Sequence, residues 1–217
     1  MLSLSSFTIN RERMIQEQLL SRGIEDARVL DAMQHTPRHI FVEDALQEQA
    51  YGDFPLPIGC GQPISQPYIV ALMTEALALE GHEKVLDIGT GSGNQAVVLS
   101  QLCARVYTVE RVELLMNRAR RIFDRLRCHN ICSRLDDGTM GWPAEAPFDR
   151  IIVTAAGPRV PEPLLAQLAD PGRLIIPVGD RYEQMLQVVE LIEGELLVHD
   201  ITPVRFVDLI GEHGWAG

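Results

Sequence analysis

A run of glycines follows a short apolar segment at residues 85–93, which read Val-Leu-Asp-Ile-Gly-Thr-Gly-Ser-Gly. Glycines just past a strand permit positive φ angles and let backbone N–H groups approach a ligand at the N-terminus of the next helix. A dinucleotide loop has the spacing Gly-x-Gly-x-x-Gly, whereas here position 94 is Asn and the third glycine comes one residue early. The run therefore predicts a nucleotide-type site but argues against an NAD-dependent oxidoreductase.

Two acidic residues end the strands that lead to this site. The pattern Asp-x-Gly-x-Gly-x-Gly, beginning at Asp87, resembles that of class I methyltransferases. Their cofactor, S-adenosylmethionine, carries a sulfonium and an ammonium group but no pyrophosphate, so the Asp87 carboxylate suits its methionine portion; a plain N-cap is the alternative. Glu110 lies 19 residues beyond Gly91 and can accept hydrogen bonds from both ribose hydroxyls.

The third expected strand is followed by Asp136-Asp137-Gly138. Asp137 can accept a hydrogen bond from the exocyclic amine of an adenine, while the Gly138 backbone meets a ring nitrogen. Side chains of adjacent residues point in different directions, so we expect no metal shared by the two aspartates. The residues expected to contact the cofactor are Asp87, Gly89, Thr90, Gly91, Ser92, Glu110, Asp137 and Gly138.

The segment after the fourth expected strand restricts the methyl acceptor. Transfer to a base amino group usually needs an Asn/Asp-Pro-Pro-aromatic cluster there, whereas residues 153–158 read Val-Thr-Ala-Ala-Gly-Pro. A catechol-type enzyme needs a magnesium site and a base, and the sequence shows neither. A carboxylate acceptor needs neither, because it is ionised at pH 7 and attacks the sulfonium methyl once it is aligned. The sequence therefore favours a carboxylate acceptor.

Residues 59–75 read Gly-Cys-Gly-Gln-Pro-Ile-Ser-Gln-Pro-Tyr-Ile-Val-Ala-Leu-Met-Thr-Glu and resemble the hallmark segment of protein-L-isoaspartate O-methyltransferases. Further stretches also resemble this family, namely residues 13–24, 37–42, 138–143, 146–149, 204–207 and 214–215. The resemblance implies methyl transfer from S-adenosylmethionine to the α-carboxylate of L-isoaspartyl residues in age-damaged proteins and peptides. The ester then cyclises to a succinimide, which can reopen as normal aspartate.

By the same resemblance, the catalytic residue is Ser65, whose hydroxyl lies between cofactor and acceptor and donates to the acceptor carboxylate. A compatible alternative makes Ser65 an N-cap for the helix that opens at Pro67. The residues expected to bind substrate are Gly61, Gln62, Ile64, Ser65 and Tyr68. The sequence departs from the usual family pattern at Cys60, Pro63, Asn94, Asp136 and Asp208. A methyltransferase of the same fold that acts on a small molecule or another protein group, and a non-catalytic binding relative, therefore stay open.

Alternating strands and helices must position these residues. Strands are expected at residues 84–88, 105–109, 131–135, 150–154 and 173–178, and helices at 95–103, 112–127 and 161–168. This alternation implies a parallel sheet with right-handed crossovers. Two last strands, 184–192 and 195–207, are joined by a Glu193-Gly194 turn into an antiparallel edge. The expected fold is a doubly wound, mostly parallel seven-stranded α/β sheet of the Rossmann-like methyltransferase type.

A helical extension is expected before this sheet. The first helix has Asn10 as its N-cap and stops at Gly23, and a second ends near Pro37. A short third helix covers residues 44–50, and the Pro- and Gly-rich residues 55–63 form turns. A helix then opens at Pro67 and closes at Gly81. We therefore expect three parts, which are residues 1–55 (helical extension), 56–80 (substrate-site loop and helix) and 81–217 (cofactor-binding core).

The composition is that of a globular protein with one core domain: of 217 residues, 46% are hydrophobic and 23% charged. The 30 acidic against 19 basic residues give a net charge of −11, which disfavours nucleic acid as a partner. No apolar run of membrane-spanning length and no secretion signal are seen, so we expect a cytoplasmic protein, which we take to be a monomer. The cysteines lack zinc-site spacing and are expected to be reduced thiols, without a metal.

Overall fold

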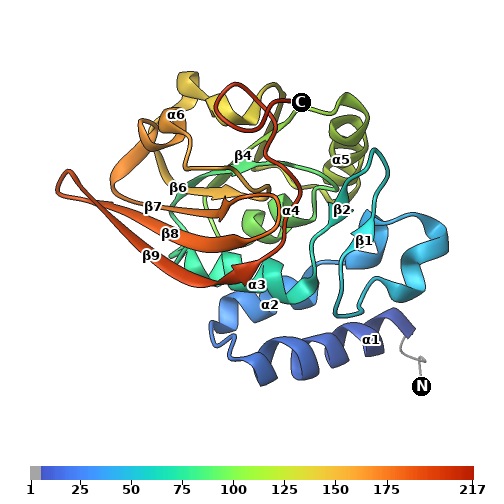
Figure 1. Ribbon diagram of the computed structural model, residues 1–217. Helices are drawn as coiled ribbons and strands as arrows, with labels where there is room; N and C mark the ends of the chain where they lie inside the picture. The colour runs from blue at the N-terminus through green and yellow to red at the C-terminus, as the bar shows by residue number, and fades with distance from the viewer. Residues whose placement is uncertain (1–5) are drawn as a thin grey trace.

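The computed structural model describes residues 6–217 and shows a twisted central sheet with helices packed on it (Figure 1). Its strands are β3 (Lys84–Ile88), β4 (Arg105–Glu110), β5 (Ile131–Leu135), β6 (Phe148–Val153), β7 (Leu168–Gly179), β8 (Gln184–Ile192) and β9 (Glu195–Val204). The seven strands lie in the order β5-β4-β3-β6-β7-β8-β9. The first five are parallel, while β8 and β9 add to the edge in antiparallel pairing. The predicted fold class is confirmed.

The order in which successive strands are added to the sheet reverses at β3. Strand β3 pairs with β4 on one side and with β6 on the other. Ligands of doubly wound sheets bind outside the carboxyl ends of the strands at such a switch point. Both central strands are apolar and largely buried, as expected for parallel strands covered on both faces. The topology therefore directs a ligand to the loops that follow β3, β4 and β6.

The α-helices within the described residues are α1 (Ser6–Met14), α2 (Ala27–His35), α3 (Pro67–Ala76), α4 (Asn94–Ser100), α5 (Glu113–Leu126) and α6 (Glu162–Leu165). Figure 1 shows α1, α2 and α3 stacked on one side of the sheet and the β8–β9 hairpin projecting past them. Alternate residues of β3 point to opposite faces, so Val85 joins the core under α1–α5 and Leu86 a second core beside α6. The first core joins the helical extension to the sheet, and we propose that the three expected parts form one structural unit.

Several element ends differ from those predicted. The first helix already begins at Ser6, so the predicted N-cap at Asn10 is wrong. After α1 the helical path continues as a π-helix (Ile15–Leu19) and a 3₁₀ helix (Leu20–Arg22). The predicted stop at Gly23 is confirmed, where φ is 86° and the N–H donates to Leu20 O. Helix α3 ends at Ala76, and Ala78 (φ 49°) turns the chain before Gly81 is reached. Helix α6 is only four residues long, because Leu168 already pairs with β6 as the start of β7.

The Pro- and Gly-rich segment forms a small hairpin. Strand β1 (Leu56–Pro57) pairs with β2 (Pro63–Ile64), and Ile58 N donates to Gln62 O over 2.9 Å. The tip contains Cys60 at φ 54° between two glycines with positive φ. The sequence predicted the turn but not the short strands, which bring Ser65 to the start of α3. Among residues 6–217, no helix is long and apolar enough to cross a membrane.

Candidate active site

A cavity of about 760 Å³ opens at the carboxyl ends of β3, β4 and β6, within the size range of cofactor sites. One side, here called the cofactor wall, consists of residues 88–92, 109–112 and 138. The opposite side, here called the acceptor wall, consists of most of residues 62–70 together with residues 202–210. The predicted glycine loop and the predicted Ser65 segment therefore face one common space.

The glycine loop of the cofactor wall is held by the neighbouring strand. The N–H groups of Gly89 and Thr90 both donate to Val109 O, over 2.9 and 3.2 Å. Gly93 caps α4 with φ 87°, and a Cβ there would lie 2.7 Å from the ring of Phe123. This tight turn requires glycine both for its backbone angle and for its packing. As predicted, Gly89, Thr90, Gly91 and Ser92 line the cavity.

Glu110 ends β4 in the cofactor wall, where it is 6% exposed. Its Oε2 accepts from Gly91 N over 2.8 Å, and its Oε1 accepts from Val112 N over 2.9 Å. The two backbone donors fix the carboxylate at the cavity surface. Each oxygen keeps a further lone pair, so the group can still accept two ribose hydroxyls.

Asp87, predicted to serve the methionine portion of the cofactor, lies under the glycine loop, where it is fully buried and is not part of the cavity lining. Its Oδ2 accepts from the Thr108 hydroxyl over 2.8 Å, and Thr108 lies 2.6 Å from the Thr90 hydroxyl. Its Oδ1 is buried without a hydrogen-bond partner among residues 6–217. Burial raises the pKa of this carboxyl to about 7, against the lowering effect of the Thr108 bond. The N-cap alternative does not hold, because Gly93 caps α4.

Asp137 also lies behind the cavity lining, and its contact with adenine stays a prediction. Its Oδ1 accepts from Thr139 N and Oγ1, over 2.8 and 2.7 Å, and its Oδ2 accepts from Glu212 N over 2.8 Å. Although burial opposes them, these bonds keep the pKa of Asp137 below its usual value. Asp137 thus fastens the C-terminal segment to the cofactor wall. Its neighbour Gly138 lines the cavity as predicted.

Asp136 and Asn94, two departures from the usual family pattern, have partners within the protein. Asp136 is half-exposed, pairs with Arg134 and lies outside the cavity lining, so its charge is compensated. Asn94 is buried at the start of α4, and its Oδ1 accepts from Arg38 over 3.2 Å. Neither residue blocks the cofactor wall.

Ser65 stands in the acceptor wall with a free hydroxyl. It lines the cavity, and its side chain has no hydrogen-bond partner in the described part of the chain. The alternative role as N-cap of α3 is not observed: Gln66 occupies that position and no side chain caps the helix. The hydroxyl is therefore available to a ligand. Gln62, Ile64 and Tyr68 line the cavity as predicted, whereas Gly61 lies outside it.

Sequence reasoning missed the mouth of the cavity. The guanidinium of Arg22 lies 3.4 Å above the centre of the Tyr68 ring and pairs with Asp53 at 3.2 Å. Asp53 also accepts from Gln66 Nε2 over 2.7 Å, so the helical extension is tied to the acceptor wall. A lone arginine at the end of a helix carries no sequence signal for this role. Residues 202–210 were also missed as lining, although residues 204–207 carry part of the family resemblance.

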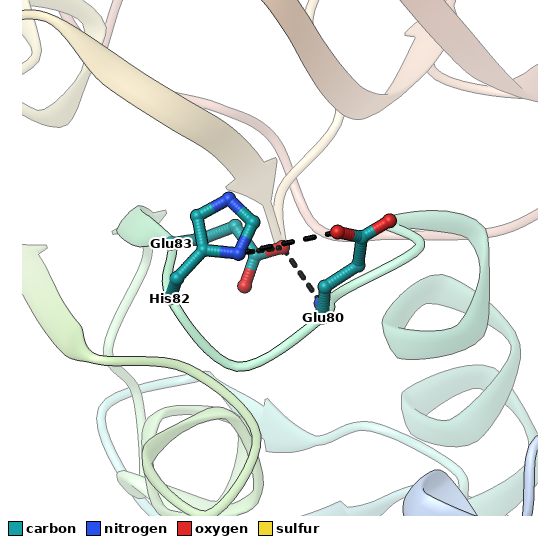
Figure 2. Close-up of side chains that lie close together, drawn as sticks. All are labelled: Glu80, His82 and Glu83. Carbon is teal, nitrogen blue, oxygen red and sulfur yellow. Dashed lines mark hydrogen bonds and ion pairs between the residues drawn. The ribbon is translucent and has the colours of Figure 1, made fainter.

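Within residues 6–217, one group could offer three ligand atoms to a metal: Glu80, His82 and Glu83, on the turn between α3 and β3 (Figure 2). The buried Glu83 carboxylate already accepts from Glu80 N and Gly81 N, over 2.6 and 2.9 Å. His82 Nδ1 lies 4.0 Å from the carboxylate of each glutamate. We interpret this cluster as the cap of a turn, remote from the cavity lining.

Comparison with known proteins identifies the family. The family model of the protein-L-isoaspartate(D-aspartate) O-methyltransferases matches residues 9–214 of this chain. A protein-L-isoaspartate O-methyltransferase of Desulfotalea psychrophila is 53% identical over 212 residues, which is 98% of this chain and 99% of that protein. Protein-L-isoaspartate O-methyltransferase 1 of Syntrophobacter fumaroxidans is 56% identical over 212 residues, with the same coverage of both chains.

Solved structures agree with this match. One protein-L-isoaspartate O-methyltransferase aligns with a TM-score of 0.85 and 28% identity over 94% of this chain and 67% of that one. A Plasmodium falciparum protein assigned to the same enzyme, in complex with S-adenosyl-L-homocysteine, aligns with a TM-score of 0.81 and 27% identity over 93% of this chain and 98% of that one. Its bound ligand is the demethylated form of the cofactor expected from the glycine loop. This chain belongs to the protein-L-isoaspartate O-methyltransferase family.

Proposed function

We propose that this protein transfers the methyl group of S-adenosylmethionine to the α-carboxylate of L-isoaspartyl residues in age-damaged proteins and peptides, with Ser65 as the residue that holds the acceptor. The observation that carries the assignment of Ser65 is its unpartnered hydroxyl, which faces the same cavity as the glycine loop. A donor at this position can bind one carboxylate oxygen and leave the other free for the methyl group.

The cofactor wall fits S-adenosylmethionine, which when bound supplies the sulfonium methyl group. Glu110 presents two fixed carboxylate oxygens for ribose hydroxyls, and Gly138 presents backbone at the position expected for adenine. The buried, unpartnered Oδ1 of Asp87 places an acceptor atom under the loop. A cationic ligand above it favours the ionised form of this carboxyl, through the loop or through a water molecule.

The acceptor wall contributes by aligning the acceptor carboxylate with the methyl group. The acceptor carboxylate is ionised at neutral pH, so no side chain must remove a proton. Ser65 donates to this carboxylate and fixes its direction, while Ile64 and Tyr68 shield it from water. Alignment of two reactants in this way lowers a barrier by several kcal/mol.

The breadth of the substrate class follows from the nature of the acceptor wall. An isoaspartyl linkage carries one extra backbone methylene, and we propose that main-chain groups of residues 62–64 and 202–207 recognise this kink with little regard for neighbouring side chains. With a net charge of −11, the chain is suited to protein clients and not to nucleic acid. We further propose that it acts as a monomer in the cytoplasm.

The test is methylation of a short peptide with one L-isoaspartyl-glycine linkage, followed as release of S-adenosylhomocysteine. The same peptide with normal aspartate is the control. We expect turnover of the isoaspartyl peptide alone, and a decrease on the order of tenfold or more in Ser65→Ala, which removes one hydrogen bond to a charged group. If neither peptide is methylated while S-adenosylhomocysteine still binds, the substrate assignment is wrong and the family assignment stands.

A further inference from the structure

Arg38, in the 3₁₀ helix Arg38–Phe41, is a buried cation without an acidic partner among residues 6–217. Its side chain is 2% exposed, and its hydrogen bonds go to neutral oxygens only. Burial lowers the pKa of this guanidinium to about 9, so the group stays protonated at neutral pH. An unpaired buried charge costs folding free energy, so its presence calls for a role other than stability.

The partners of Arg38 come from three separate segments. Nε donates to Ala50 O over 2.6 Å, at the end of the helical extension. Nη2 donates to Ser65 O over 2.6 Å, in the acceptor wall. Nη1 donates to Asn94 Oδ1 over 3.2 Å, at the start of the helix that follows the glycine loop. Ser65 and Asn94 line the cavity, whereas Arg38 does not, so its guanidinium lies behind the lining and joins the two sides.

We propose that Arg38 is a positioning residue, which holds the Ser65 segment in register with the glycine loop and thereby aligns the acceptor carboxylate with the methyl group. This inference rests on the proposed function. The planar guanidinium directs its donors along fixed lines, which a lysine cannot reproduce. Small displacements of reacting groups cost large factors in rate, so loss of this link affects turnover more than binding.

The charge of Arg38 has a separate effect. Methyl transfer from a sulfonium to a carboxylate cancels both charges, so a nearby cation stabilises the acceptor anion before transfer more than in the transition state. An interaction of this kind lowers KM without raising kcat. The two effects of Arg38 can therefore be told apart by kinetics. Loss of the alignment lowers kcat, whereas loss of the charge raises the KM for the peptide.

The experiment compares Arg38→Lys and Arg38→Met with Arg150→Met, using the isoaspartyl peptide and calorimetry with S-adenosylhomocysteine. Arg150 is a matched control, because its guanidinium also donates to backbone carbonyls, those of Leu77, Asp149 and Ala78, and lies outside the cavity lining. Melting curves give the folded fraction, and rates are expressed per folded molecule. Arg38→Lys keeps the cation, and it serves as the deciding variant where Arg38→Met does not fold.

We expect Arg38→Lys to lower kcat on the order of tenfold with little change in the peptide KM, and Arg38→Met to lower kcat similarly and to raise KM. S-adenosylhomocysteine affinity changes by less than about threefold in both, and Arg150→Met keeps wild-type kcat. Wild-type kcat in Arg38→Lys would overturn the positioning role, as would equal losses of kcat in Arg150→Met at equal loss of stability. If the wild-type protein does not methylate this peptide, the proposed function is wrong, and this inference, which rests on it, is wrong as well.

Discussion

The two walls of the cavity are built in different ways. The cofactor wall is made of backbone that continues directly from adjacent parallel strands, and its loop bonds to Val109 O in the next strand. The acceptor wall joins a hairpin near residue 60 to the end of β9, and side chains such as Arg38 and Arg22 hold it in place. Sheet hydrogen bonds therefore hold the cofactor wall, whereas a few long side chains hold the acceptor wall.

The largest effect is expected from a substitution in the cofactor wall at Glu110. In Glu110→Gln, an amide nitrogen replaces one of the oxygens that accept from Gly91 N and Val112 N, and the ribose hydroxyls lose a charged acceptor. Hydrogen bonds to a charged group contribute about 1.5–3 kcal/mol each. We expect the affinity for S-adenosylhomocysteine, measured by calorimetry, to fall about 100-fold.

The matched control for this variant is Glu113→Gln. Glu113 is exposed in the first turn of α5 and is not part of the cavity lining, so its variant keeps wild-type affinity. A Glu110→Gln protein that binds S-adenosylhomocysteine as tightly as the wild type would show that Glu110 only braces the glycine loop.

The same contrast explains what the sequence could predict. The glycine loop, Glu110 and Gly138 were predicted because each follows a strand directly, and the ends of parallel strands meet at one edge. Arg22 and Arg38 were missed because their contacts join residues 12 to 56 positions apart, and no local pattern marks such pairs.

Asp87 and Asp137 were predicted to contact the cofactor, and the structure places both in the right region but behind the cavity lining. The sequence indicates that a residue lies at the end of a strand, whereas the direction of the side chain of that residue depends on the residues packed around it. For Asp87 the neighbour is Thr108 on β4, and for Asp137 it is the C-terminal segment at Glu212. Ser65 and Tyr68 were predicted through the family resemblance, because nothing in their local pattern places them at a cavity.

A second test concerns the free energy of folding that burial of the Asp87 carboxyl costs under the cofactor wall. The pKa of Asp87 is raised by burial from 3.8 to about 7, so between these values the folded protein binds more protons than the unfolded chain. The free energy of unfolding contributed by this group therefore falls as pH rises from about 4 to about 7. In Asp87→Asn this penalty is absent, and the ligand-free variant should exceed wild-type stability at pH 8 by up to about 4 kcal/mol, but not at pH 4.

Denaturant unfolding of the ligand-free proteins at both pH values measures this difference. Asp124→Asn, at an exposed position of α5, is the control and should follow the wild-type pH dependence. Parallel curves for Asp87→Asn and wild type would show that Asp87 titrates near its ordinary value. With S-adenosylhomocysteine present, the advantage of Asp87→Asn at pH 8 should shrink, because the ligand stabilises the ionised wild-type carboxyl.

The smallest effect is expected at the mouth of the acceptor wall. Arg22 and Asp53 expose 40% and 42% of their side chains, and exposed ion pairs of this kind stabilise proteins by less than about 1 kcal/mol. The stacking of Arg22 on Tyr68 contributes a similarly small amount. We expect Arg22→Met to raise the KM for the isoaspartyl peptide about two- to threefold, because Tyr68 and Gln66 lose one support, and to leave the affinity for S-adenosylhomocysteine unchanged.

Salt separates the two contributions at this mouth. The Arg22–Asp53 pair weakens as ionic strength rises, so the difference in KM between wild type and Arg22→Met should narrow in high salt, while stacking on Tyr68 persists. Arg28→Met removes an exposed arginine of the same helical extension, paired with Asp26 at 2.8 Å and absent from the cavity lining, and should leave KM unchanged. Arg22→Met would contradict this expectation if it changed the affinity for S-adenosylhomocysteine as much as it changed the KM for the peptide. The two walls would then not be independent, because the helical extension would support both through one connected set of contacts.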